Sequence, residues 1–150
     1  MSADPSRQRI AELIRLDGRH AAVTGGAGGI GCAIARRLAE SGAAVSIGDL
    51  DDSSCRRAAD EIAAATGSEV SALSLDVRNS QCVEGFADAA ERSAGPIDIW
   101  INNAGVFPIK PVAEMDEEEW DAVCDINLRG YFLGAREAAR RMRQQPDRPG

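Results

Sequence analysis

Five glycines fall within seven consecutive positions near the start of the chain: Gly25, Gly26, Gly28, Gly29 and Gly31. They follow a short apolar stretch, residues 20–24, and precede a segment with helical spacing, residues 30–40. Glycine lets the backbone turn tightly and approach a bound group closely, and a helix that begins there presents its free amides to a negative charge. These residue types and this spacing favour a loop that binds a pyrophosphate.

Two registers of this loop fit a nucleotide-binding pattern. Gly26, Gly28 and Gly31 satisfy G-x-G-x-x-G, whereas Gly25, Gly29 and Gly31 give a second spacing. The chain holds 15 glycines in 150 residues, so either match alone is weak. A strand before the loop and a helix after it strengthen the match, although a turn shaped only for strand-to-helix packing is the alternative. Both registers stay open at this point.

Asp49 follows the second apolar stretch, about 20 residues beyond the glycines, where a carboxylate accepts hydrogen bonds from ribose hydroxyls. A 2′-phosphate there would be repelled, because two unit charges about 4 Å apart cost about 4 kcal/mol at an effective dielectric constant near 20. No Arg or Lys lies in the loop or directly after Asp49, and Asp51 and Asp52 add negative charge. The pattern predicts NAD rather than NADP. The alternative is that Asp49, Asp51, Asp52 or Ser53 caps the next helix.

A regular alternation of strands and helices would place these residues. We expect strands over residues 20–24, 43–48, 69–75 and 97–101, and helices over residues 30–40, 53–66, 79–93 and, after an irregular loop, about 117–142. Such an alternation predicts an α/β protein with a Rossmann-like, doubly wound parallel sheet, apparently truncated after the fourth strand and a long helix. Right-handed crossovers order the first three strands 3-2-1 and put the fourth beside the first.

Composition divides the chain into three parts. Residues 1–18 form a polar leader in which Ile10, Leu13 and Ile14 suit one face of a helical turn. Residues 19–143 form the incomplete NAD-binding domain, and residues 144–150, with two prolines and no apolar side chain, form a linker or truncated end.

The overall charge and the cysteines exclude several classes of function. With 17 basic and 24 acidic residues the net charge is −7, which argues against nucleic acid and against an anionic membrane surface as partners. The start of the chain lacks the apolar segment of a secretory signal. The four cysteines form no C-x-x-C pair, which favours reduced thiols in a cytoplasmic protein and no metal site.

The segment Thr24-Gly-Gly-Ala-Gly-Gly-Ile-Gly31 occurs together with Asn102-Asn-Ala-Gly105. With this pair the sequence resembles the N-terminal, cofactor-binding portion of the classical short-chain dehydrogenase/reductase family, over about residues 16–143. The resemblance implies that Asp76 and Val77 flank an adenine and that residues 103–105 line the cofactor. The implied cofactor-binding residues are Gly25, Gly29, Ile30, Gly31, Asp49, Asp76, Val77, Asn103, Ala104 and Gly105. A helix cap at Asp76 and a self-stabilised turn at Asn102 and Asn103 are the alternatives.

One face of the long helix carries the remaining match. Residues there step by three and four: Trp120, Cys124, Asn127, Tyr131, Ala135 and Ala138. The resemblance implies that Asn127 helps to hold a water in a proton relay, whereas a structural Asn bracing the helix is the alternative. Tyr131 is followed four positions later by Ala135, so the family's Y-x-x-x-K is not present and Tyr131 is interpreted as a packing residue. The only histidine, His20, is expected to be structural or solvated.

The resemblance implies an oxidoreductase that transfers a hydride between NAD and a secondary alcohol or ketone. No residue matches the family's catalytic serine, tyrosine or lysine, and the only lysine, Lys110, lies in the loop after the fourth strand. This chain is therefore expected to hold the cofactor-binding part only, with a small-molecule substrate and homo-oligomers in a complete enzyme. A non-catalytic NAD-binding or dimerising truncated module is the alternative. A methyltransferase also uses a glycine loop, but residues 102–105 count against it.

Overall fold

A computed structural model of the chain describes residues 10–145 and contains one parallel sheet. Its strands are β1 (His20–Thr24), β2 (Ala44–Asp49), β3 (Val70–Ser74) and β4 (Ile99–Ile101), in the order β3-β2-β1-β4. Ala21 of β1 pairs with Val45 on one side and with Ile99 on the other. The predicted doubly wound sheet and its strand order are confirmed.

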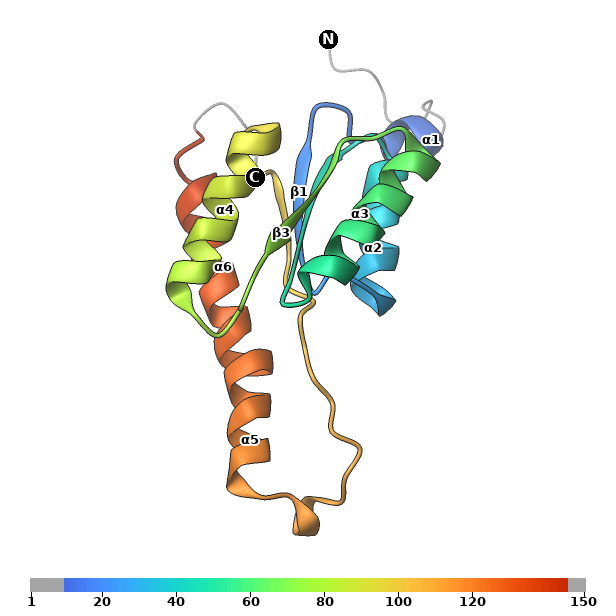
Figure 1. The fold of residues 1–150 in the computed structure, drawn as a ribbon. Helices are drawn as coiled ribbons and strands as arrows, with labels where there is room; N and C mark the ends of the chain where they lie inside the picture. The colour runs from blue at the N-terminus through green and yellow to red at the C-terminus, as the bar shows by residue number, and fades with distance from the viewer. Residues whose placement is uncertain (1–9, 146–150) are drawn as a thin grey trace.

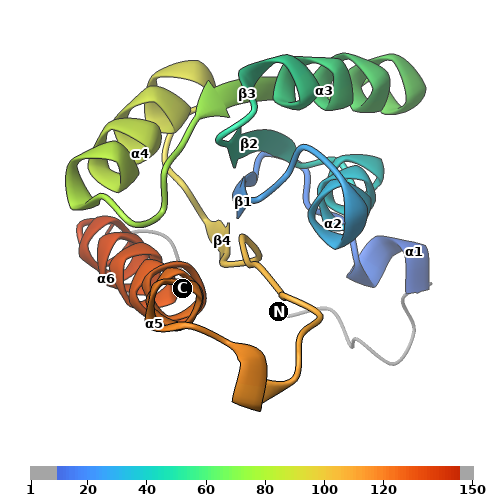
Figure 2. The ribbon, with the colours of Figure 1, turned by 60° about the horizontal axis from the view of Figure 1, so that its bottom comes forward.

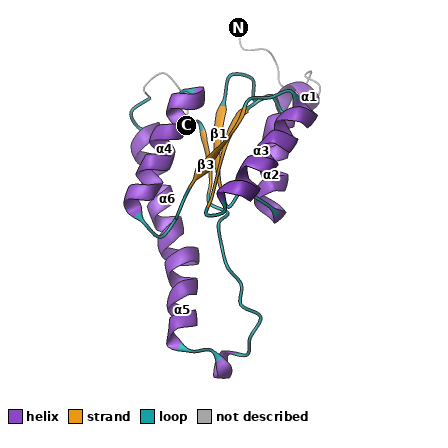
Figure 3. Ribbon diagram, in the orientation of Figure 1, coloured by secondary structure: helices purple, strands orange, loops and turns teal. Residues whose placement is uncertain are grey.

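Helices cover both faces of this sheet (Figure 1). They are α2 (Gly29–Glu40) and α3 (Asp52–Thr66) on one face, and α4 (Ser80–Ala94) and α6 (Tyr131–Met142) on the other (Figure 2). The short α1 (Ile10–Leu13) lies at the end of the molecule opposite α5 (Glu117–Cys124), which extends beyond the sheet (Figure 3). No helix within residues 10–145 is long and apolar enough to cross a membrane.

The core forms one apolar layer on each side of the sheet. Val23, Val45 and Ile47 point toward α2 and α3, where alanines and Ile62 allow close helix packing. Ala22 points the other way, toward the layer that contains Phe86. Alternate residues of β1 thus enter different layers, as the period of a strand requires.

Side-chain caps start three of the helices. Asp51 accepts the backbone N–H groups of Ser53 and Ser54 at the start of α3. Asn79 accepts two backbone N–H groups of the first turn of α4, and Asp116 accepts one in the first turn of α5. Neither Asp49 nor Asp76 is therefore the helix cap that the sequence left open, because Asp51 and Asn79 have those roles. By contrast, α2 begins at Gly28 without a side-chain cap.

The continuous helix expected over residues 117–142 is wrong in its middle. A π-helix, η3 (Asp125–Gly130), separates α5 from α6, and a short 3-10 helix, η2 (Val112–Glu114), precedes them. A π turn holds more residues per turn than an α turn, so the residues after it face a different direction. Of the predicted face, Ala138 is buried, whereas Trp120 and Tyr131 are 57% and 41% exposed. The buried face of α6 consists of Leu133, Gly134, Glu137 and Ala138.

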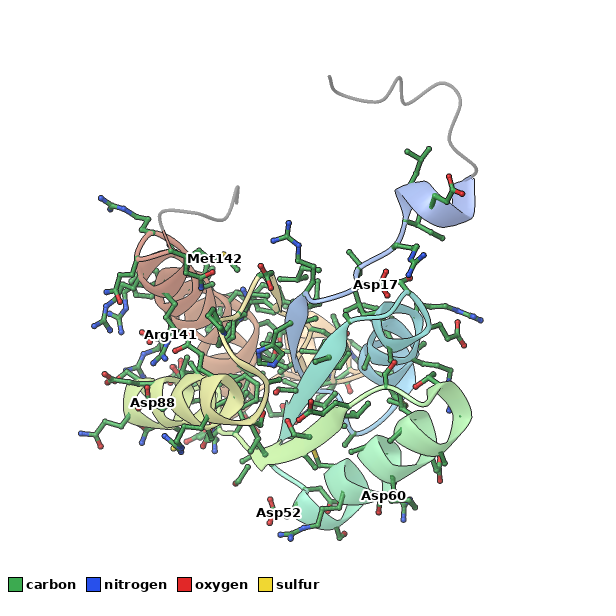
Figure 4. The ribbon with its side chains drawn as sticks, turned by 90° about the horizontal axis from the view of Figure 1, so that it is seen from above. Asp17, Asp52, Asp60, Asp88, Arg141 and Met142 are labelled. Carbon is green, nitrogen blue, oxygen red and sulfur yellow. The ribbon has the colours of Figure 1, made fainter. Side chains whose placement is uncertain are left out.

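One arginine joins α6 to α4 (Figure 4). The Arg141 guanidinium donates to the carboxylates of Asp88 at 2.7 Å and Glu91 at 2.5 Å, both on α4. It also donates to Glu137 at 2.7 Å, one turn earlier on its own helix. Glu137 and Arg141 are 6% and 14% exposed, whereas Asp88 and Glu91 are 50% and 30% exposed, so this ion network is buried at α6 and open to solvent at α4.

His20 is structural. Its ring is buried, with Nδ1 2.8 Å from the carbonyl oxygen of Gly95 and Nε2 2.9 Å from the hydroxyl of Ser46. The two contacts join the start of β1 to β2 and to the turn before β4. They lie at the amino ends of the strands, away from the glycine loop.

Candidate functional site

The loops after the four strands meet at the carboxyl ends of the sheet, the edge at which open α/β sheets bind ligands. They enclose a cleft of about 380 Å³. Its walls contain eight of the residues implied by the sequence: Gly25, Ile30, Asp49, Asp76, Val77, Asn103, Ala104 and Gly105. Gly28, from the other glycine register, also lines it, and five residues line it without having been predicted: Leu50, Leu75, Val106, Phe107 and Ile126. Gly29, Gly31 and Asn127 lie outside its walls.

Close packing explains the glycines of the loop. Gly25 has a φ of +67°, and a Cβ there would lie 2.7 Å from the Cα of Ala104. At Gly31 a Cβ would lie 2.2 Å from the carbonyl oxygen of Gly25, which brings α2 against the loop. Gly26 is required for another reason, since its Cβ would lie 2.6 Å from that of Ile47 in the core. Gly29 also has a positive φ, +53°, so the backbone conformation favours glycine at Gly25 and Gly29, whereas packing requires it at Gly26 and Gly31.

The loop after β4 is fixed to the loop after β1 by Thr24. The buried Thr24 hydroxyl accepts the backbone N–H groups of Asn103 at 3.0 Å and Ala104 at 3.1 Å. The Asn103 amide donates in turn to the carbonyl oxygens of Thr24 and Gly25, each at 3.0 Å. Asn103 therefore holds two loops together rather than only its own turn. Thr24 belongs to the sequence motif, but its role as the shared acceptor was not predicted.

Asp49 lies at the end of β2 with its carboxylate beside the glycine loop. It accepts the N–H of Ala27 at 3.1 Å and that of Asp51 at 3.4 Å. These two bonds orient the carboxylate within the cleft wall. The next carboxylate, Asp51, is kept ionised because hydrogen bonds from Ser54 and Ser53 hold its pKa well below its usual range. This end of the cleft is consequently negative.

Asp76 and Val77 form the wall next to η3. Both carboxylate oxygens of Asp76 accept hydrogen bonds from Arg78, whose side-chain donation is the main reason that the pKa of Asp76 is lowered. Val77 packs against Gly130, where a Cβ would lie 2.9 Å from a Val77 methyl group. The last residue of the π-helix must therefore be small for this wall to close.

Asn127 lies in the π-helix and binds the loop after β4. Its amide donates to the carbonyl oxygen of Val106 at 2.8 Å, and its carbonyl oxygen accepts the N–H of Val106 at 2.9 Å. This pair of bonds fits a positioning role for the side chain, as in the structural alternative. A part in a proton relay stays a prediction.

A family model described as short chain dehydrogenase matches residues 19–148. This chain belongs to the short-chain dehydrogenase family. The 3beta-hydroxysteroid dehydrogenase 2 of Eggerthella lenta is 37% identical over 126 residues, covering 83% of this chain and 48% of that protein. The D-threitol dehydrogenase of Mycolicibacterium smegmatis is 39% identical over 131 residues, covering 85% and 49%. The chain thus spans about half the length of these relatives.

The crystal structure of a short-chain type dehydrogenase/reductase from Mycobacterium marinum matches with a TM-score of 0.86 and 34% identity. The match covers 91% of this chain and 54% of that one. This chain therefore has the fold of that short-chain dehydrogenase/reductase over about half of that protein's length.

Two carboxylates, those of Asp49 and Asp76, are the ionisable side chains that line this cleft. None of the residues that line it is a serine, tyrosine or lysine. Lys110 pairs with Glu119 at 2.6 Å outside the cleft. Tyr131 is 41% exposed and uses its backbone oxygen to accept from Asn102, so it is less of a packing residue than predicted.

Proposed function

We propose that this chain binds NAD in the cleft and forms the cofactor-binding part of a short-chain oxidoreductase. The observation that carries the proposal is that two parts of one cleft, the start of α2 and the carboxylate of Asp49, favour ligand groups of opposite charge preference. The start of α2 favours an anion, whereas the carboxylate of Asp49 favours hydroxyl donors and disfavours an anion.

The start of α2 supports a pyrophosphate. Its first turn contains no acidic residue, and a Cβ at Gly28 would meet nothing within 4 Å. The cleft wall is therefore open beside Gly28, and the helix dipole adds partial positive charge at the start of α2. The side-chain caps of α3, α4 and α5 use amides of their first turns, whereas α2 has no side-chain cap, so α2 suits a phosphate group.

The Asp49 end supports NAD over NADP. Its carboxylate is a ready acceptor for two ribose hydroxyls, and ionised Asp51 lies two residues away. A 2′-phosphate placed there would meet negative charge without a lysine or arginine in the glycine loop to offset it.

The reaction and the assembly follow from the family and are part of the proposal. A bound nicotinamide ring accepts or gives a hydride, and secondary alcohols or ketones are the substrate class that the names of the steroid and threitol relatives support. Homo-oligomers and a cytoplasmic location are proposed with it. A cofactor-binding role without turnover is proposed for these 150 residues, because serine, tyrosine and lysine are missing from the cleft.

Replacing Asp49 by Ala tests the choice of cofactor. Losing the hydroxyl acceptor weakens NADH binding, and losing the charge strengthens NADPH binding. We expect the dissociation constant of NADPH divided by that of NADH to fall at least about tenfold, as measured by titration calorimetry. Asp60→Ala removes the same charge from an exposed site further along α3 and should leave the ratio near that of the wild type. An unchanged ratio in Asp49→Ala would contradict the assignment of Asp49.

A turnover assay tests the division between binding and chemistry. With NAD and a panel of secondary alcohols, the chain should bind cofactor but show no NADH formation above background. Robust hydride transfer at 340 nm would show that another group in the chain replaces the missing tyrosine and lysine.

A further inference from the structure

The end of the cleft beside the loop after β4 is apolar. Five residues that line it there have no polar side chain: Ala104, Gly105, Val106, Phe107 and Ile126. Phe107 is 85% exposed, and its ring lies next to Gly105, where a Cβ would be 3.7 Å from the Phe107 Cε2 atom. An aromatic ring at the rim of the cleft therefore has a large apolar area that a ligand could bury.

The backbone at this end of the cleft has few polar groups to offer a ligand. Asn127 accepts the N–H of Val106 at 2.9 Å and donates to its carbonyl oxygen at 2.8 Å. The N–H groups of Asn103 and Ala104 both donate to the Thr24 hydroxyl. A ligand hydroxyl that entered here would lose its hydrogen bonds to water and gain few in return, which is unfavourable, whereas an apolar group would lose none.

The strand order sets this apolar end apart from Asp49. Asp49 ends β2, the glycine loop follows β1 and the apolar end follows β4, and these three strands are adjacent in the sheet (Figure 2). A dinucleotide with one ribose at Asp49 and its pyrophosphate at the start of α2 would extend its other half toward residues 104–107. The substrate has to meet that half, because the hydride passes between the two.

We propose that this end of the cleft selects substrates in which the reacting carbon carries an apolar group, alkyl, alicyclic or aromatic, over sugars and polyols. The inference rests on the proposed function, because it takes the reacting half of the dinucleotide to lie beside the loop after β4. Phe107 packs against the apolar group of the substrate. Asn127 is a positioning residue, which holds Val106 and keeps the backbone groups of Val106 from a competing hydroxyl.

Two ketones with the same butanone skeleton test this inference: benzylacetone, which carries a phenyl ring, and erythrulose, which carries hydroxyl groups. Heteronuclear NMR titration of the NADH-saturated chain measures the dissociation constant of each ketone and shows which backbone amides it affects. Benzylacetone should bind at least about fivefold more tightly than erythrulose. Its largest chemical-shift changes should lie at Val106 and Phe107.

Three variants test the residues. Phe107→Ser removes the ring from an exposed position and should weaken benzylacetone binding at least about threefold more than erythrulose binding. Ile109→Ser is the matched control, because Ile109 is fully exposed on the same loop but does not line the cleft, so the preference should stay that of the wild type. Asn127→Ala frees the N–H and the carbonyl oxygen of Val106, so erythrulose should bind more tightly and the preference should narrow.

Equal binding of the two ketones by the wild type, or the same change in preference in Phe107→Ser and Ile109→Ser, would overturn the inference. NADH is titrated first and alone, so that the two proposals can fail separately. A chain that binds NADH but neither ketone would overturn the inference and leave the proposed function intact. A chain that does not bind NADH would overturn both.

Discussion

The hydroxyl of Thr24 shows how much of the site depends on one oxygen atom. It is buried at the end of β1 and accepts two backbone N–H groups from the loop after β4. Each of these amides would otherwise be a donor without a partner at the base of the cleft. A valine has nearly the same shape as threonine but no acceptor, so the position separates hydrogen bonding from packing.

Thr24→Val should therefore destabilise the protein by about 2–3 kcal/mol, since each unsatisfied buried amide costs about 1–3 kcal/mol. Urea denaturation followed by circular dichroism measures the change. Thr24→Ser keeps the oxygen and loses only a methyl group, so its loss should be clearly smaller. Equal losses in the two variants would show that the methyl group, rather than the hydroxyl, is what β1 needs.

At the scale of elements, the sequence predicts the repeated strands and helices but not the π-helix or the irregular loop after β4. The alternation of apolar strands and helical segments predicted all four strands and their order. The π-helix over residues 125–130 was not predicted, because a spacing of three and four residues indicates one continuous α-helical face. The wider π turn does not change the amino-acid composition, so the sequence gives no sign of it. Val106 and Phe107 were likewise missed as cleft residues, because an irregular loop has no periodicity to place them.

The contact between α4 and α6 depends on Arg141, whose side chain is only 14% exposed. Arg141→Ala removes the shared partner of Asp88, Glu91 and Glu137, but Asp88 and Glu91 are 50% and 30% exposed, so water replaces much of their contact. Arg140 still pairs with the buried Glu137, and we therefore expect a loss of about 1–2 kcal/mol in the free energy of unfolding. Arg143→Ala serves as the control, because Arg143 is exposed just after the end of α6. This substitution should change the free energy of unfolding little. A negligible loss in Arg141→Ala would show that apolar contacts alone hold α6 in place.

For the molecule as a whole, acid destabilises the fold because it protonates carboxylates that are stabilised in their ionised form. The pKa values of Asp51, Asp76 and Glu119 are all lowered, mainly by side-chain hydrogen bonds from Ser54, Arg78 and Lys110 respectively. A carboxylate with a lower pKa in the folded than in the unfolded state stabilises the fold above its unfolded pKa, near 4, as estimated from model peptides. That contribution is lost as the pH falls through the folded value.

The melting temperature should accordingly fall as the pH is lowered from about 5 to about 2, as measured by scanning calorimetry. Asp51→Asn keeps a side chain that can cap α3 but no longer titrates, so its melting temperature should fall less steeply over that range. Asp60→Asn, which removes a charge from an exposed site further along α3, is the matched control (Figure 4). A melting temperature that rises toward pH 2 would contradict this account.

The sequence placed most of the site because its residues follow strands, and strands could be predicted. Gly25, Asp49, Asp76 and Asn103 each come directly after a strand or within two residues of one, and parallel strands bring such positions to one edge. Contacts between loops were beyond prediction, since the partner of Thr24 is set by how two distant turns meet. The side chain of Asn127 is a similar case, because its contact with Val106 depends on the π-helix.

The position of β1 in the sheet has a consequence during protein synthesis. The contact between Thr24 and Asn103 spans 79 positions, which a ribosome needs roughly 4 to 16 s to translate at about 5–20 residues per second. During that interval β1 can pair with β2, but the edge of β1 that later pairs with β4 has no partner strand. The nascent chain therefore carries an open strand edge for seconds, and the cleft is among the last parts of the molecule to form.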